Sequence, residues 1–141
     1  MLEVNALGVM LTVREAVRRM STRHGGNGGS IVTVSSIASR LGSPHEYVDY
    51  AASKGAIDSF TLGVAREVAS EGIRANVVRP GIIDTDIHGS GGQPDRAERL
   101  GPQIPMQRPG TADEVAEAIV WLLSEGASYA TGATIDLGGG R

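Results

Sequence analysis

The sequence of 141 residues contains no cysteine, which excludes a disulfide framework, a thiolate nucleophile and a zinc–thiolate site. No apolar run approaches the roughly 18–20 residues that a membrane-spanning helix needs. The net charge is −3 and there is no basic run, so the sequence lacks the electrostatic pattern of a nucleic-acid-binding protein. The start, Met1-Leu2-Glu3, has neither the basic nor the apolar region of a signal peptide. We therefore expect a cytoplasmic protein.

Lysine is also scarce, because the 13 basic residues comprise twelve arginines and a single lysine, Lys54. Arginines thus supply the basic side chains expected on the protein surface, and the presence of a single lysine needs another explanation. Glycine, in contrast, accounts for 20 residues, about twice its usual share, which indicates frequent tight turns. Hydrophobic residues make up 40% of the chain, an ordinary fraction for a globular protein. We expect one domain over residues 1–141.

The order of predicted elements favours an α/β fold. Apolar residues three and four positions apart predict helices over residues 2–20, 47–70 and 111–124, the last beginning at a capping box of Thr111 and Glu114. Runs rich in β-branched residues predict strands over residues 30–36, 73–79 and 133–137. This alternation is typical of parallel strands with helical crossovers. Residues 84–110 form a loose stretch that is too long for a simple connection.

The chemistry centres on Tyr50 and Lys54, which lie four residues apart and share one face of a predicted helix. An ammonium group near a phenol favours the phenolate and lowers its pKa, so the tyrosine becomes a usable general acid/base. Ser36 ends a predicted buried parallel strand, where ligand crevices open in such sheets. Its hydroxyl could bond the oxygen of a reacting carbonyl. Taken singly, a Tyr–Lys pair is more often a surface contact, and a serine at a strand end more often caps a loop.

Five motifs in order resemble the classical short-chain dehydrogenases/reductases. They are Val4-Asn5-Ala6-Leu7-Gly8, Ile31-Val32-Thr33-Val34-Ser35-Ser36, Tyr50-Ala51-Ala52-Ser53-Lys54-Gly55, Asn76-Val77-Val78-Arg79-Pro80-Gly81 and the segment Thr131 to Gly140. The resemblance covers nearly the whole chain. Among members of the family, the sequence looks closest to 3-oxoacyl-acyl-carrier-protein reductases and glucose 1-dehydrogenase-like enzymes.

This resemblance implies a catalytic role for four residues. Tyr50 would exchange the proton with the substrate oxygen, and Lys54 would lower the Tyr50 pKa and hold the nicotinamide ribose. Ser36 would orient the substrate carbonyl, and Asn5 would hold a water that links Lys54 to solvent. Ser35 is the poorer candidate for the serine role because strand alternation points it to the opposite face.

The resemblance also implies a nicotinamide cofactor, NAD or NADP, and a small alcohol or ketone as substrate. Besides Tyr50 and Lys54, the cofactor would contact Pro80, Gly81, Ile83 and Thr85. Residues 84–110 would form the substrate-binding lid. The lid residues that could line the site, unless they belong to a solvated loop, are His88, Gln93, Met106 and Gln107.

The family's amino-terminal half, with its glycine-rich phosphate turn between a strand and a helix, is absent from this sequence. Residues 25–29 cannot replace that turn because they follow a predicted helix and precede a strand. We therefore expect the carboxyl-terminal part of a Rossmann-type doubly wound sheet, with the family's fifth, sixth and seventh strands side by side. We also expect a homo-oligomer. The alternative function is that of a truncated, inactive remnant that acts only as an association module.

Two other classes of site are weakly supported. A serine hydrolase could use Ser36, His45 and Asp49, but the nucleophile-elbow pattern Gly-x-Ser-x-Gly is absent. A metal site could draw on His24, His45 and His88, but these residues lack ligand spacing, so we expect no metal.

Overall fold

The computed structural model describes residues 1–141, except for the side chain of Ser90. The longer helices are α1 (Val9–Met20), α3 (Val48–Val68) and α6 (Ala112–Leu123). The short α-helices are α2 (Ala38–Leu41), α4 (Ile87–Ser90) and α5 (Arg96–Leu100). A π-helix, η1 (Glu3–Gly8), precedes α1, and the 3₁₀ turns are η2 (Thr22–His24), η3 (Ala69–Glu71), η4 (Gly101–Gln103) and η5 (Glu125–Ala127). The strands are β1 (Gly29–Val34), β2 (Ile73–Pro80), β3 (Ile83–Asp84), β4 (Gly110–Thr111) and β5 (Thr134–Leu137).

The main sheet contains three parallel strands in the order β1-β2-β5. Val34 of β1 pairs with Val78 of β2, and Val78 pairs with Ile135 of β5. The remaining two strands, β3 and β4, form a separate parallel pair in which Ile83 lies opposite Gly110. The predicted α/β class, with three parallel strands side by side, is confirmed.

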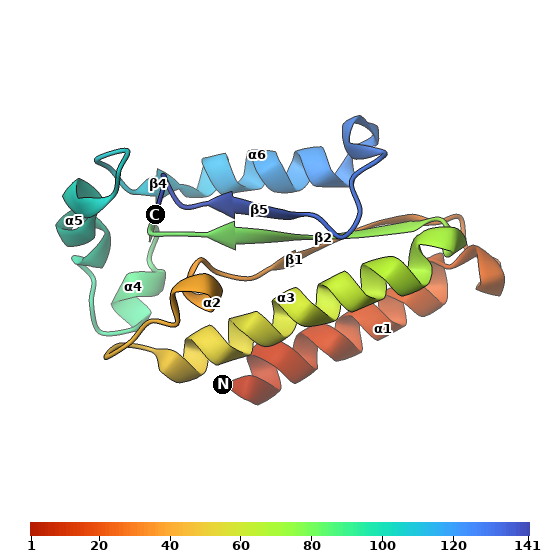
Figure 1. Ribbon diagram of the computed structural model, residues 1–141, viewed down its shortest axis with the longest axis horizontal. Coiled ribbons are helices and arrows are strands. Elements are labelled where there is room, and N and C mark those ends of the chain that lie inside the picture. The colour runs from red at the N-terminus through yellow and green to blue at the C-terminus, as the bar shows by residue number, and fades with distance from the viewer.

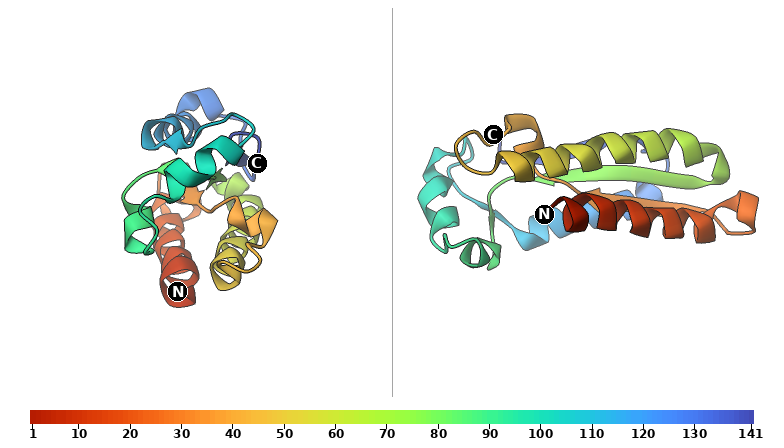
Figure 2. Two further views of the ribbon diagram at one scale, coloured as in Figure 1. Left: turned by 90° about the vertical axis from the view of Figure 1, so that its left-hand side faces the viewer. Right: turned by 90° about the horizontal axis from the view of Figure 1, so that it is seen from below.

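Helices cover both faces of the main sheet (Figure 1). The helices α1 and α3 lie side by side on one face, and α6 lies on the other, as the end-on view in Figure 2 shows. Successive side chains of β2 point to opposite faces of the sheet, so this strand packs against α6 on one face and against α3 on the other. On the α6 side, Val78 and Leu122 are fully buried and form a cluster with Ala127. On the α3 side, Thr33 of β1 and Thr61 share a buried hydrogen bond of 2.8 Å.

Element boundaries differ from the predictions in places where long-range bonds decide them. The predicted strand over residues 30–36 ends as β1 at Val34, yet the pairing with β2 continues. The amide of Ser35 donates to the Val78 carbonyl (2.9 Å), and the amide of Ile37 donates to the Pro80 carbonyl (3.0 Å). The predicted capping box is present, with bonds in both directions between Thr111 and Glu114.

The stretch over residues 84–110 is more ordered than the loose loop that the sequence predicts. It contains α4, α5, η4 and the β3–β4 pair. A small core of Ile82, Ala97 and Ile104 holds these elements together, and Leu100 packs against it. Ile82 lies 15 positions from Ala97 and 22 from Ile104, so local composition does not reveal this core. No helix in the described part of the chain is long and apolar enough to cross a membrane.

Candidate active site

The candidate site lies at the edge of the sheet where the parallel strands end. The strands β1, β2 and β5 all point toward the segment that carries α4 and α5 (Figure 1). Open parallel sheets bind ligands at this carboxyl edge. The first turns of α3 run beside it and supply Tyr50 and Lys54.

The structure brings Tyr50 and Lys54 together on one face of α3. The Lys54 Nζ atom is 5.7 Å from the centroid of the Tyr50 ring. The same ammonium donates a hydrogen bond of 2.9 Å to the carbonyl of Val34, the last residue of β1. Partial burial lowers the pKa of Lys54, and the Asp58 carboxylate opposes this effect. The ammonium is thus fixed at the strand end, next to the phenol.

The two serines after β1 make different contacts. The Ser35 hydroxyl is buried and donates to the backbone carbonyl of Lys54 at 3.1 Å. The Ser36 hydroxyl oxygen is half-buried and accepts a bond of 3.1 Å from the Ala38 amide. An acceptor contact leaves the hydroxyl proton of Ser36 available for another partner. Of the two serines, Ser36 is therefore the one whose proton could reach a ligand oxygen.

Asn5 reaches the same turn of α3 from the π-helix η1. Its Nδ2 donates to the Ser53 hydroxyl at 3.2 Å, and that hydroxyl donates to the backbone carbonyl of Tyr50 at 2.7 Å. Ser53 is fully buried. Asn5 is thus connected to the segment between Tyr50 and Lys54 by two consecutive hydrogen bonds. The apolar spacing over residues 2–20 predicts an ordinary α-helix, so the π-helix, an irregularity found frequently at functional sites, is not visible in the sequence.

The residues predicted to hold the cofactor lie at the end of β2 and just beyond it. Pro80 ends β2, and the Gly81 amide donates to the Leu137 carbonyl at 3.0 Å. A Cβ atom on Gly81 would lie 2.8 Å from the Cα of Gly138, so only glycine fits this crossing. Ile83 lies in β3, and its carbonyl accepts a bond of 2.8 Å from His88 Nε2. Thr85 follows β3 and is exposed.

The predicted lid is tied to the loop before α3 by four residues, here called the latch: Glu46, Tyr47, Gln93 and Arg96. Arg96 donates to Glu46 Oε2 at 2.6 Å and lies 5.6 Å from the centroid of the Tyr47 ring. Gln93 donates to the Tyr47 hydroxyl at 3.0 Å and accepts from Arg96 at 3.1 Å. The hydrogen bond from Arg96 lowers the pKa of Glu46. Of these four, the sequence singled out Gln93 alone.

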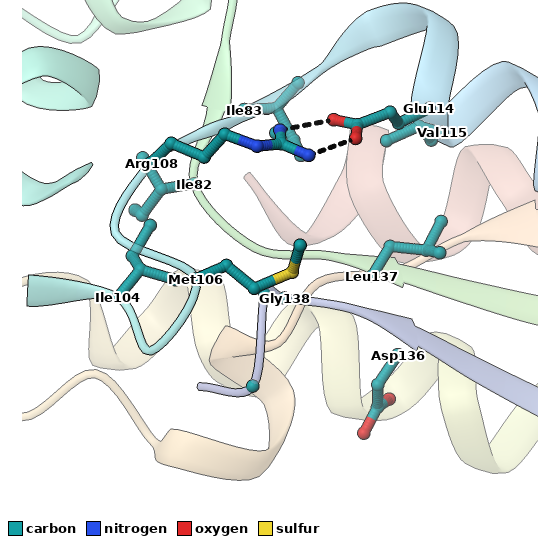
Figure 3. A pocket seen from close by; sticks show the side chains of 13 residues that line it. Ile82, Ile83, Ile104, Met106, Arg108, Glu114, Val115, Asp136, Leu137 and Gly138 are labelled. Atoms are coloured by element: carbon teal, nitrogen blue, oxygen red, sulfur yellow. Dashed lines mark hydrogen bonds and ion pairs between the residues drawn. The ribbon is translucent and has the colours of Figure 1, made fainter. Parts of the chain in front are cut away.

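A pocket of about 330 Å³ lies between residues 104–108 of the predicted lid and the end of β5. Its volume is at the lower end of the usual range for small-molecule sites. Ile104 and Met106 from the lid and Leu137 from β5 form much of its apolar wall (Figure 3). An ion pair between Arg108 and Glu114 borders it, with contacts of 2.9 and 2.6 Å. Gln107, the remaining predicted lid residue, donates to the Ile104 carbonyl instead.

The hydrolase and metal alternatives receive no support from the geometry. The Asp49 carboxylate accepts a bond of 2.9 Å from the Tyr50 amide at the helix start, and His45 is exposed. Among the hydrogen bonds of the described residues, none joins Ser36, His45 and Asp49. Nor do the described residues contain a group of three or more His, Cys, Asp or Glu side chains placed to hold a metal ion.

The fold and the site together are those of a parallel α/β sheet with a tyrosine–lysine pair at its carboxyl edge. A family model described as enoyl-(acyl carrier protein) reductase matches residues 1–141. The chain belongs to the short-chain dehydrogenase/reductase family, which confirms the resemblance seen in the sequence.

Relatives with curated names and solved structures agree with this assignment. The chain is 63% identical over 140 residues to the uncharacterized oxidoreductase YgfF of Escherichia coli, covering 99% of this chain and 57% of that protein. It is 41% identical over 138 residues to a glucose 1-dehydrogenase of Gluconobacter oxydans, covering 97% and 51%. The structure of ElxO with NADP bound superimposes with a TM-score of 0.82 at 33% identity, covering 96% and 54%. The chain thus spans about half the length of these relatives.

Proposed function

We propose that the chain carries the catalytic part of an oxidoreductase that transfers hydride between a nicotinamide cofactor and an alcohol or ketone. The observation that carries this proposal is the Lys54 ammonium, fixed to the Val34 carbonyl and 5.7 Å from the Tyr50 ring. Two relatives support it, since one is a glucose 1-dehydrogenase and another, ElxO, has been solved with NADP bound.

In the proposed reaction, Tyr50 is the general acid/base. During reduction its phenol gives a proton to the carbonyl oxygen of the substrate, and during oxidation the phenolate takes the alcohol proton. The positive charge of Lys54 favours the phenolate. Ser36 directs its free hydroxyl proton toward the same substrate oxygen. Asn5 holds the Tyr50–Lys54 turn in place through Ser53 and, we propose, binds a water that connects Lys54 to solvent.

The described residues fit the nicotinamide end of the cofactor, which supplies or accepts the hydride when bound. The glycine crossing at Gly81 lets the chain turn closely past Gly138 at the end of β5. Tyr50 and Lys54 would hold the ribose hydroxyls, and Pro80, Gly81, Ile83 and Thr85 would contact the nicotinamide and its carboxamide. The sequence lacks the glycine-rich turn between a strand and a helix that binds pyrophosphate. The chain alone should therefore bind the whole cofactor weakly.

Each half of the cofactor can be tested separately. Because Lys54 is the only lysine in the chain, labelling with ¹³Cε-lysine gives one side-chain NMR signal at the site. We expect nicotinamide mononucleotide to shift this signal at millimolar concentrations, and AMP, the other half of NAD, to leave it unchanged. A Tyr50→Phe variant should still fold, but its Lys54 signal should respond less to nicotinamide mononucleotide, because the hydroxyl proposed to hold the ribose is gone. Equal effects of the two nucleotides, or none from nicotinamide mononucleotide, would contradict the proposed site.

The alternative of an association module rests on a different observation. The strand β1 lies at the edge of the main sheet, and Val34 at its end is 46% exposed. Leu7 and Leu11, on η1 and α1, are 50% and 41% exposed. Open strand edges and apolar patches favour association. We propose that the chain forms homo-oligomers through these surfaces; light scattering after size-exclusion chromatography would refute this by showing a monomer at all concentrations.

A further inference from the structure

Lys54 has an acidic neighbour one helical turn further along α3. Asp58 follows Lys54 by four residues, so the two side chains share a helix face. The side chain of Asp58 is only 13% exposed. Its Oδ2 atom accepts bonds from Arg79 Nε at 3.1 Å and Arg79 Nη2 at 3.0 Å. The other oxygen, Oδ1, is buried and has no hydrogen-bond partner among the described residues.

Arg79 fixes this carboxylate from the neighbouring strand. Its guanidinium also reaches Asp136 Oδ1 on β5 at 3.4 Å, and Asp136 in turn pairs with Arg40 on α2. Charges of alternating sign therefore run from the end of β5 to the catalytic turn of α3. Arg79 and Arg40 offset Asp136 and one oxygen of Asp58, while the second oxygen of Asp58 has no such partner. Lys54 lies one helical turn before Asp58 on the same helix face, and its ammonium bonds the Val34 carbonyl.

Few other charges compete for Lys54. The elements packed on α3 around Lys54 contribute Glu3 from η1, Arg40 from α2 and Arg79 from β2, and β1 contributes no titratable side chain. The helix α1 also packs on α3, and its charged side chains are those of Arg14, Glu15, Arg18 and Arg19. On α3 itself, the titratable residues within five positions of Lys54 are Asp49, Tyr50 and Asp58. Among the charged groups of the described residues, Asp58 is the one that opposes the effect of burial on the pKa of Lys54.

We propose that Asp58 is a positioning residue whose carboxylate, held by Arg79, keeps the Lys54 ammonium charged and directed toward Val34 and Tyr50. The site needs a positive charge next to the phenol, but the partial burial of Lys54 favours the neutral amine. A fixed carboxylate one turn away offsets part of this effect of burial without touching substrate or cofactor. Its catalytic consequence rests on the proposed function, whereas its effect on Lys54 does not.

The test is a pH titration of the single ¹³Cε-lysine signal in the full chain. Asp58→Asn keeps the shape and the acceptor for Arg79 but removes the charge. We expect the titration midpoint of Lys54 to fall by about 0.5 pH units or more, the size of a Coulomb interaction between partly solvated groups one turn apart. Circular dichroism at each pH value verifies that the chain remains folded.

Two further variants separate this effect from a structural one. Glu67→Gln makes the same change in net charge on the exposed surface of α3, about 20 Å along the helix from Lys54, and should leave the midpoint unchanged. Asp58→Glu keeps the charge and should restore most of the shift. The inference is overturned if the midpoint in Asp58→Asn stays constant or rises, if Glu67→Gln lowers it equally, or if Asp58→Glu does not restore it.

Salt provides the same test without a substitution. If attraction to Asp58 dominates, raising the KCl concentration screens it and lowers the Lys54 midpoint in the unmodified chain. If repulsion by the arginines dominates, salt raises the midpoint and the inference is wrong. Neither measurement depends on nucleotide binding. A chain in which Lys54 responds to Asp58 but not to nicotinamide mononucleotide would refute the proposed function and leave the pair intact.

Discussion

Replacing Gly81 by alanine tests whether the glycine crossing shapes the candidate site. The added Cβ would lie 2.8 Å from the Cα of Gly138 and 3.5 Å from its carbonyl carbon and oxygen. These are backbone atoms, so no flexible side chain can give way. The Gly81 amide also donates to the Leu137 carbonyl. The link between β2 and β3 must therefore move away from the end of β5.

The cost follows from overpacking at a constrained position. Inserting a methyl group into close-packed structure costs about 1–3 kcal/mol. For a chain of this length, 1 kcal/mol corresponds to roughly 4 °C in the melting temperature, so we expect a fall of about 4–12 °C. Because Gly81 turns the chain toward Ile83, the same displacement should weaken the response of Lys54 to nicotinamide mononucleotide.

Gly63→Ala is the matched control, since it adds the same methyl group where nothing lies within 4 Å. Gly63 is exposed in the interior of α3, where alanine is favoured over glycine by about 0.5–1 kcal/mol. The melting temperature, measured by circular dichroism, should thus fall in Gly81→Ala and rise in Gly63→Ala. If the melting temperature of Gly81→Ala equals or exceeds that of the unmodified chain, the backbone crossing is not as tight as described and the reasoning fails.

Two further predictions concern the lid and the helix that follows it. Arg96→Met breaks the latch and should speed amide hydrogen exchange over residues 86–100 by roughly fivefold, the equivalent of about 1 kcal/mol, whereas Arg66→Met on exposed α3 should not. The hydrogen bond from Arg108 is the main cause that lowers the pKa of Glu114 from 4.5 to about 2. Since the folded state has the lower pKa, the stabilisation is present above about pH 4.5 and is lost as the pH falls toward 2. Melting temperatures in this window should therefore depend less on pH in Glu114→Gln than in the unmodified chain.

The features that the sequence predicts well are those with a local signal. The β-branched runs and the apolar spacing identify the three strands and three long helices, and the order of elements implies parallel pairing. The four-residue step from Tyr50 to Lys54 places both on one face because helical geometry alone determines it. The capping box of Thr111 and Glu114 is local in the same sense.

The features that it misses depend on contacts between distant positions. Arg96 and Glu46 of the latch lie 50 residues apart, and Arg79 lies 21 residues from Asp58, so no periodicity relates either pair. The short elements of the lid exist because Ile82, Ala97 and Ile104 bury one another. A composition rich in glycine, proline and charge conceals that core, which is why a loose loop was the natural prediction.

The geometry of the proposed catalytic pair, Tyr50 and Lys54, depends on elements within this chain. Lys54 is tied to the end of β1 twice, because its ammonium donates to the Val34 carbonyl and its backbone carbonyl accepts from the Ser35 hydroxyl. Neither bond involves the region that would bind cofactor phosphates, so the position of the ammonium is fixed before any ligand arrives. Phosphate contacts would then add affinity rather than shape the site. In this chain, Lys54 should therefore still respond to the nicotinamide half of the cofactor. The chain should lack the additional affinity that contacts to the cofactor phosphates would provide.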